Sequence, residues 1–211
     1  STLNAGSLYC FGFSFWKQNY IRCFLKAPSN KLAFVWKKQA ALKQGFNKKS
    51  QLVIWGERAA SEAKALAIGA ESAIWRVEDG FIRSVGVGSD YTPPLSLVVD
   101  QRGIYYDPNQ ASDLEYYLQN SNFSQKLLDR ASVLRNRLLQ NRLSKYNLGI
   151  EPVVEAIKAA KGQLIILVPG QVEDDVSIRK GCLDIADNTA LLKAVRAAKP
   201  DAYVIYKPHH E

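Results

Sequence analysis

The segment QLVIWGERAASEAKALAIGAESAIWRV, residues 51–77, decides the fold class of this chain. Its apolar runs at 51–55 and 72–77 are rich in β-branched and aromatic residues and predict strands, and the alanine-rich stretch 58–69 between them predicts a helix. Strands that are hydrophobic along their whole length, with helices between them, are typical of a parallel sheet covered on both faces. The same rhythm precedes this segment, with strands predicted at 7–15 and 31–36 and helices at 19–25 and 37–45.

The second half of the chain changes pattern and then returns to it. Residues 94–100 and 103–107 predict two short strands around an Arg-Gly turn, and residues 112–146 predict a helix with leucines on one face and Arg and Lys on the other. A further alternation follows, with a helix at 152–160, a strand at 163–169, a helix at 188–199 and a strand at 202–206.

These elements predict two α/β lobes. We expect a GT-B-like architecture with two Rossmann-like parallel-sheet lobes, in which ligands bind at the carboxyl ends of the strands. The first lobe would span residues 1–110, and residues 111–150 would form a helical connector. Residues 151–211 would begin the second lobe, which breaks off after two strands in this chain.

Composition and charge narrow the class of protein. The three cysteines follow no disulfide or zinc pattern, and no apolar run approaches the roughly 20 residues that span a bilayer. A cytoplasmic protein is therefore predicted. The net charge is +8, and the first 50 residues carry nine Lys and Arg with no Asp or Glu. These residues could be solvated lysines on helix faces or could attract an anionic membrane surface, whereas no nucleic-acid-binding motif supports a nucleic acid as partner.

A first candidate site follows the strand at 72–77. Glu78 and Asp79 lie between Arg76 and Arg83, followed by a glycine-rich stretch. Paired carboxylates beside arginines can transfer protons, and glycines allow a ligand to approach the backbone. An ordinary Asp-Gly turn with surface ion pairs would give the same pattern.

Two further candidate sites follow the later strands. Residues 169–178, PGQVEDDVSI, contain three consecutive carboxylates. They could hold a metal, stabilise a positively charged oxocarbenium-like transition state, or cap the next helix. The last strand is followed by Lys207 and His209, which could neutralise a phosphate, although histidines at a chain end are often merely structural.

Four strings in order, RVEDGFIRSVGVGSD, PLSLVVDQRGIYYD, ILVPGQVEDDVSI and AYVIYKPH, resemble the capsular polysaccharide β-Kdo transferases, specifically the C-terminal type of their two catalytic modules. The resemblance covers nearly the whole chain. It implies a transferase that uses CMP-β-Kdo, retains the β configuration and extends a lysophosphatidylglycerol-type glycolipid at the inner membrane. In such a transferase residues 1–110 would bind the acceptor, and residues 151–211 would begin the CMP-sugar-binding lobe. Because that lobe is truncated in this chain, we expect this fragment itself to be weakly active or inactive. Retention through two displacements needs a nucleophilic carboxylate and a proton-transfer group.

The resemblance also implies residue roles and partners. Asp175 falls on the family's Asp-x-Ser motif as the nucleophile, and Glu78 is the acid/base candidate, with Asp79 as its neighbour or substitute. The family's Lys-Pro-His-Pro motif falls on Lys207, Pro208 and His209, but His210 stands where the family usually has Pro. Candidates for substrate binding are Arg76, Arg83, Gln171, Ser177, Lys207 and His209.

No metal or other cofactor is expected, since Lys207 and His209 could neutralise the donor's single phosphate. The expected partners are CMP-Kdo, the anionic glycolipid, the inner-membrane surface with which the cytoplasmic protein would associate peripherally, and other capsule assembly proteins. The alternative is a non-catalytic basic module that binds anionic glycans or the membrane.

Overall fold

A computed structural model describes residues 6–56, 60–149 and 154–209, which fall into two compact units. The first unit contains residues up to 105 and 109–148, and the second contains 106–108 and the residues from 149 onward. The starts predicted for the helices at Arg58 and at residue 152 lie outside the described residues, as does His210. Within the described ranges, no helix combines the length and apolar character that a membrane crossing requires.

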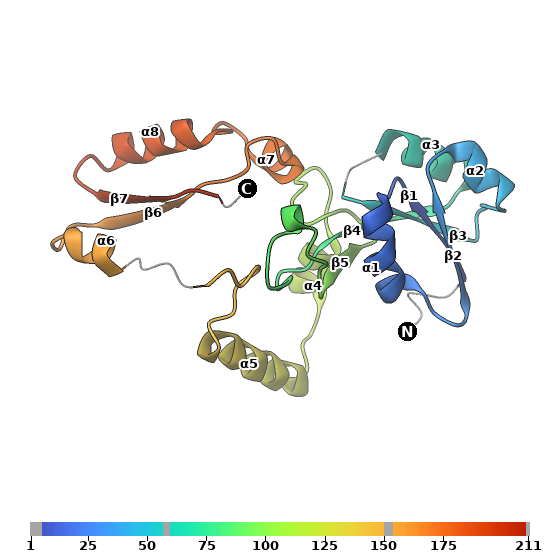
Figure 1. Cartoon of the computed structure of the whole chain (residues 1–211), viewed down its shortest axis with the longest axis horizontal. Helices are drawn as coiled ribbons and strands as arrows, with labels where there is room; N and C mark the ends of the chain where they lie inside the picture. The colour runs from blue at the N-terminus through green and yellow to red at the C-terminus, as the bar shows by residue number, and fades with distance from the viewer. Residues whose placement is uncertain (1–5, 57–59, 150–153, 210–211) are drawn as a thin grey trace. The chain divides into compact units, whose positions relative to one another are not determined.

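The first unit is built on a five-stranded sheet with the strand order β2-β1-β3-β4-β5 (Figure 1). Its strands are β1 (Gly6–Phe11), β2 (Asn30–Val35), β3 (Ser50–Trp55), β4 (Ala73–Asp79) and β5 (Leu97–Asp100). The first four are parallel, and β5 runs antiparallel to β4. The predicted α/β class with a parallel sheet is therefore confirmed.

Helices cover both faces of this sheet. On one face, α2 (Lys38–Lys43) and α3 (Ala60–Ala70) enclose a core that includes Tyr9, Phe46 and Leu66. On the other face, α1 (Phe15–Leu25) packs over Leu8 and Val77. The strand alternation explains this division, because successive side chains of β1, β3 and β4 enter opposite cores.

The first strand ends earlier than predicted. An apolar run continues to Phe15, but the strand stops at Phe11, and Gly12 has a φ of +73°, a conformation that favours glycine. Ser14 then takes the N-cap position of α1. The prediction of a strand over 7–15 was wrong at its end because the backbone turns at Gly12 and α1 already begins at Phe15.

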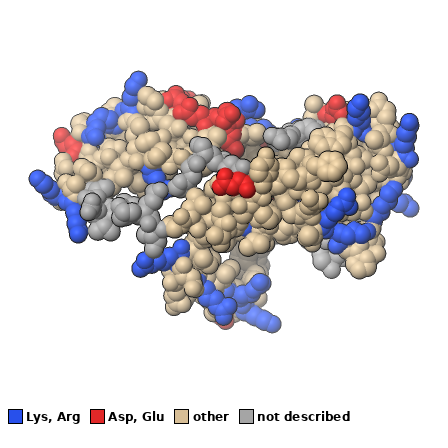
Figure 2. Space-filling view, viewed as in Figure 1, with Lys and Arg blue, Asp and Glu red and all other residues tan. Residues whose placement is uncertain are grey.

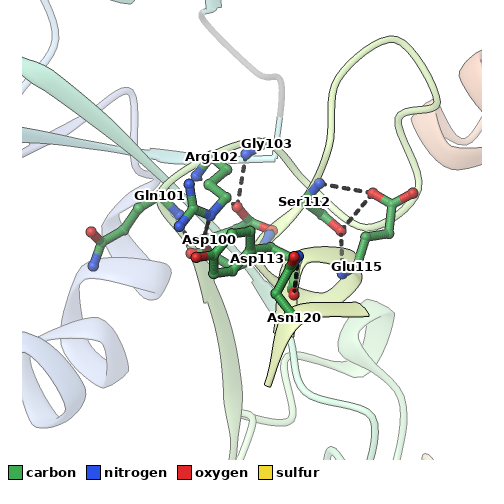
Figure 3. A network of polar contacts seen from close by, with 9 residues as sticks. Asp100, Gln101, Arg102, Gly103, Ser112, Asp113, Glu115 and Asn120 are labelled. Atoms are coloured by element: carbon green, nitrogen blue, oxygen red, sulfur yellow. Dashed lines mark hydrogen bonds and ion pairs between the residues drawn. The ribbon is translucent and has the colours of Figure 1, made fainter. Parts of the chain in front are cut away.

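The Asp100 side chain shapes the chain after β5 (Figure 3). Its Oδ1 accepts hydrogen bonds from the backbone amides of Arg102 and Gly103 at 2.9 and 2.8 Å, and its Oδ2 accepts one from Asp113 N at 3.0 Å. The backbone therefore turns directly after the strand. The predicted strand at 103–107 was wrong, since these residues form turns instead.

The predicted helix over 112–146 is two helices, α4 (Asp113–Asn120) and α5 (Gln125–Gln140). Helix α4 starts with a capping box in which Ser112 and Glu115 satisfy each other's backbone amides, and these hydrogen bonds hold the pKa of Glu115 below its usual value. Serines at 121 and 124 end α4 and begin α5. The prediction of one helix was wrong because these polar capping positions interrupt the leucine pattern.

The second unit contains a parallel pair of strands, β6 (Ile165–Pro169) and β7 (Tyr203–Lys207). Its helices are α6 (Val154–Ala159), α7 (Val176–Gly181) and α8 (Asn188–Ala198). The strands and α8 match the predicted alternation closely, whereas no apolar periodicity predicted the short helix α7. The register of the pair joins Pro169 to Lys207, so the carboxyl ends of both strands lie together.

Candidate active site

The end of β4 presents four candidate residues in alternation. Ile74 lies against the core beneath α3 and Val77 against the core beneath α1. Because side chains alternate along a strand, Arg76 and Glu78 belong to the α3 face and Asp79 to the α1 face. Glu78 and Asp79 are thus adjacent in sequence but point to opposite faces of the sheet.

Asp79 forms a largely buried ion pair with Arg83. The Arg83 side chain is 1% exposed and that of Asp79 is 23% exposed, and Nε of Arg83 lies 2.7 Å from Oδ2 of Asp79. Nη1 of Arg83 also donates to Ser84 Oγ at 2.8 Å. A Cβ at Gly88 would lie 3.0 Å from Nη2 of Arg83, so a glycine there leaves room for the guanidinium. This pair is internal to the fold rather than one of the surface ion pairs that the sequence also allowed.

The glycine-rich loop after β4 is held by residues 145–147. The Lys145 carbonyl accepts hydrogen bonds from the amides of Arg83 and Ser84, and the Tyr146 carbonyl accepts one from Gly86 N at 2.8 Å. Asn147 Nδ2 donates to the Ser84 carbonyl at 2.8 Å. Sequence reasoning missed this support, since partners separated by about 60 residues leave no local pattern.

An aromatic group on α1 adjoins the same strand end. The Trp16 ring centroid lies 5.3 Å from that of Tyr20 and 5.5 Å from that of Tyr91, and Tyr20 is also in edge contact with Trp55. Burial, and then the negative charge of Asp79, raise the pKa of Tyr20 above its usual value. Within the described residues, the Tyr20 hydroxyl and Oδ1 of Asp79 are buried without hydrogen-bond partners. Sequence reasoning placed none of these aromatic residues at the site.

Tyr91 has an unusual backbone conformation. Its φ is +59°, in the left-handed region, and its side chain is 71% exposed. A non-glycine residue in this region costs on the order of 1–2 kcal/mol. Burial offsets little of this cost because most of the ring is exposed, and strained residues of this kind concentrate at functional sites.

The second unit brings two sequence clusters together. The amide of Gly170 donates to the Lys207 carbonyl at 2.7 Å, and a Cβ at Gly170 would lie 2.6 Å from the Tyr206 hydroxyl and 3.2 Å from the His209 amide. Only a glycine allows this close approach. Gln171 is tied to the start of α8, because its amide donates to Asn188 Oδ1 at 2.8 Å. The candidates Gln171, Lys207 and His209 therefore share one strand edge.

The acidic run 173–175 provides two helix caps. Glu173 Oε1 accepts from Asn188 N at 2.8 Å at the start of α8. Asp175 is the N-cap of α7, and its Oδ1 accepts from the amide and the hydroxyl of Ser177 at 2.7 and 2.5 Å. Asp175 Oδ2 makes no hydrogen bond within the described residues, and neither does the Asp174 side chain. The capping interpretation of this run thus fits its geometry.

Helix α7 is tethered by a buried aspartate. Lys180 Nζ lies 2.5 Å from Oδ2 of Asp107, whose side chain is 6% exposed. This ion pair joins residues 106–108 to the helix that Asp175 caps. It stabilises a six-residue helix that has no buried residue of its own.

The candidate residues thus form two groups, Arg76, Glu78, Asp79 and Arg83 in the first unit, and Gln171, Asp175, Ser177, Lys207 and His209 in the second. Among the residues that the structure describes, no group of three or more His, Cys, Asp or Glu is arranged to hold a metal ion.

Residues 50–211 match the model of the family described as "Capsule polysaccharide biosynthesis protein". The chain belongs to this family. The match includes both strand ends described above and all nine candidate residues. The capsule biosynthesis family therefore accounts for the order of the motifs on which the sequence resemblance rested.

The individual relatives that the chain matches are longer proteins. The chain is 42% identical to the capsule polysaccharide modification protein LipA of Neisseria meningitidis over 97% of its own length, and it spans 28% of LipA. It is 38% identical to the lipopolysaccharide-processing protein LpsZ of Rhizobium meliloti over 74% of its length, which is 36% of LpsZ.

Two solved structures are similar over nearly the whole chain. Thermosulfurimonas dismutans KpsC, β-Kdo 2,7 transferase, has 33% identity and a TM-score of 0.71, covering 97% of this chain and 62% of that one. The β-Kdo 2,4 transferase of the same organism's KpsC has 27% identity and a TM-score of 0.75, covering 98% and 61%. The likeness therefore extends through both units of the chain.

Proposed function

We propose that the full-length protein is a retaining β-Kdo glycosyltransferase of capsule biosynthesis. It would transfer Kdo from CMP-β-Kdo to a Kdo-primed, lysophosphatidylglycerol-type glycolipid. The observation that carries the proposal is the pairing of Pro169 with Lys207, which sets the Gly170–Asp175 loop beside Lys207 and His209 at one strand edge. Similarity to two KpsC transferases over 97% and 98% of the chain supports it.

The second unit would bind the donor. Gly170 lets the loop after β6 pack closely against Tyr206 and His209 at the strand ends, where parallel α/β sheets bind nucleotides. Lys207 and His209 would neutralise the single phosphate of CMP-Kdo, so that no metal ion is required. The first unit would then bind the acceptor.

The chemistry would proceed by two displacements. Oδ2 of Asp175 attacks the anomeric carbon of Kdo, the bond to the CMP phosphate breaks, and CMP leaves with the electron pair. The acceptor hydroxyl then attacks the same carbon, Glu78 takes its proton, and the Asp175 carboxylate leaves, so that the β configuration is retained. Asp79, which is paired with Arg83, is the neighbour of Glu78 and its possible substitute in the proton transfer.

The helix cap at Asp175 allows a sharp test. Asp175→Asn should keep the helix cap, because Asn is as good an N-cap as Asp and its amide oxygen can accept the hydrogen bonds from Ser177. The amide cannot act as the nucleophile. Asp174→Asn is the matched control, since this neighbouring carboxylate makes no contact to lose within the described residues. Transfer is followed by mass spectrometry in the full-length protein, with CMP-Kdo generated in the tube.

We expect wild type and Asp174→Asn to add one Kdo to the acceptor. Asp175→Asn should add none, although its unfolding transition should match that of wild type. Glu78→Gln should slow the second displacement and accumulate protein that carries one covalent Kdo on the peptide containing Asp175. Transfer by Asp175→Asn at the wild-type rate would refute the assigned nucleophile.

The alternative function is a non-catalytic module that binds anionic glycans or the membrane through its basic residues. Figure 2 shows lysines and arginines spread around the visible face of the first unit. If wild type transfers nothing, yet binds anionic vesicles equally well with and without Glu78 and Asp175, this alternative replaces the transferase. Peripheral membrane association of a cytoplasmic enzyme would use the same residues, and reversing Lys37, Lys38, Lys48 and Lys49 to Glu would weaken vesicle binding.

A further inference from the structure

We propose that Trp16 and Tyr91 form the docking site for the acceptor sugar in the first unit, with Asp79 and Tyr20 as its polar partners. This inference rests on the proposed transferase function and goes beyond it by naming the residues that hold the acceptor. None of the three aromatic residues belongs to a motif that the sequence resemblance used.

The two rings form an open corner. The planes of Trp16 and Tyr91 are almost perpendicular, at 84°, with centroids 5.5 Å apart. Tyr91 is 71% exposed and Trp16 is partly exposed, so part of each residue is accessible to a ligand. The apolar C–H face of a pyranose ring fits against such an aromatic surface, which is itself amphipathic in the case of tyrosine.

Polar groups that lack partners adjoin this corner. The Tyr20 ring lies 5.3 Å from that of Trp16, and its hydroxyl is buried without a hydrogen-bond partner in the described residues. Oδ1 of Asp79 is in the same condition, and its charge acts on Tyr20. Buried polar atoms are seldom left unpaired in a native protein. Both atoms are closed to solvent, so the side chains that cover them would shift when a sugar hydroxyl binds to them.

A cation indicates which sugar fits. Lys17, in the first turn of α1, holds its ammonium 3.5 Å from the centre of the Trp55 ring. The helix N-terminus adds to the positive potential, and the first turn of α1 contains no acidic residue. Lys17 and the helix N-terminus would attract a sugar that carries a carboxylate, such as a terminal Kdo on the acceptor.

The conformation of Tyr91 also offers a clean variant. Its φ of +59° suits glycine better than tyrosine, so Tyr91→Gly removes the ring while keeping or raising the stability of the fold. Trp36→Leu is the control, because this tryptophan is 54% exposed after the neighbouring strand β2 and makes no ring contact within the described residues. Trp16→Leu is the second test variant.

The experiment measures initial rates of the full-length protein against acceptor and donor concentration separately. We expect Tyr91→Gly and Trp16→Leu to raise the KM for the acceptor about tenfold, while the KM for CMP-Kdo changes by less than about twofold. Trp36→Leu should leave both values unchanged. An unchanged acceptor KM in Tyr91→Gly would overturn the assignment.

A binding measurement separates this inference from the proposed function. Saturation-transfer NMR with a Kdo glycoside and with a neutral glucoside needs no turnover. If wild type transfers no sugar but binds the Kdo glycoside, and Tyr91→Gly abolishes that binding, the transferase proposal fails and the docking site stands. If transfer is normal and the glycoside signal is the same in Tyr91→Gly and wild type, the docking site fails alone.

Discussion

Removing either partner of the ion pair between Asp79 and Arg83 should destabilise the first unit strongly. Arg83 is 1% exposed and its Nε lies 2.7 Å from Asp79 Oδ2, so Asp79→Asn leaves a guanidinium charge that water hardly reaches. Breaking a buried pair by removing one partner costs about 3–5 kcal/mol, and we take the lower end, about 3 kcal/mol, because Asp79 is partly solvated. Native stabilities are about 5–15 kcal/mol, so the loss is a large fraction of the total.

Urea denaturation followed by tryptophan fluorescence can measure this loss. All four tryptophans lie before residue 106 and report on the first unit. With a urea dependence of about 2 kcal/mol per molar, the midpoint should fall by about 1.5 M in Asp79→Asn and in Arg83→Met. The double variant should lose clearly less than the sum, because no unpaired charge remains.

An exposed ion pair provides the control. Arg102 Nε lies 3.0 Å from Asp113 Oδ1, but the Arg102 side chain is 47% exposed. Arg102→Met should therefore cost below about 1 kcal/mol. The reasoning about burial is refuted if Asp79→Asn costs no more than this control, or if the effects of the two single substitutions simply add.

Further predictions concern Asp100, Tyr20 and Gly170. Asp100→Ala should destabilise the first unit by about 3 kcal/mol in the same urea assay, because three backbone amides lose their acceptor. Asp100→Asn should cost less stability, and equal losses in the two variants would contradict this reasoning. Tyr20→Phe should be as stable as wild type or about 1 kcal/mol more stable at neutral pH, since the hydroxyl has no partner in the described residues. Burial raises the pKa of Tyr20, so near pH 10 this tyrosine ionises only in the unfolded chain. Wild-type stability should therefore fall as the pH rises past that value. Thermal unfolding at neutral and alkaline pH should show a smaller fall in Tyr20→Phe. Gly170→Ala should raise the KM for CMP-Kdo, because the added Cβ would lie 2.6 Å from the Tyr206 hydroxyl. Adding Tyr206→Phe to this variant should lower the KM part of the way back. An unchanged KM in Gly170→Ala would contradict the close approach.

Hydrophobic patterning predicted the strands well and their limits less well. The runs that became β2, β3 and β7 are mostly apolar and lie next to turn residues, so their position along the chain is a local property of the sequence. The end of β1 and the absent strand at 103–107 depended instead on the backbone at Gly12 and on hydrogen bonds that backbone amides donate to Asp100. The division between α4 and α5 was readable in principle, since serines at 121 and 124 are capping residues.

The sequence by itself determined the α/β class, the motifs at the strand ends and the family resemblance, because each depends on residue types at short spacing. It could not distinguish a surface Asp-Gly turn from a buried Asp79–Arg83 pair, or an acidic loop from a cap at Asp175. Nor could it show that Tyr20 and Tyr91 adjoin Trp16. Only the tertiary structure decided these points, since burial and the contacts of residues far apart in the chain arise when the sheet register and helix packing are set.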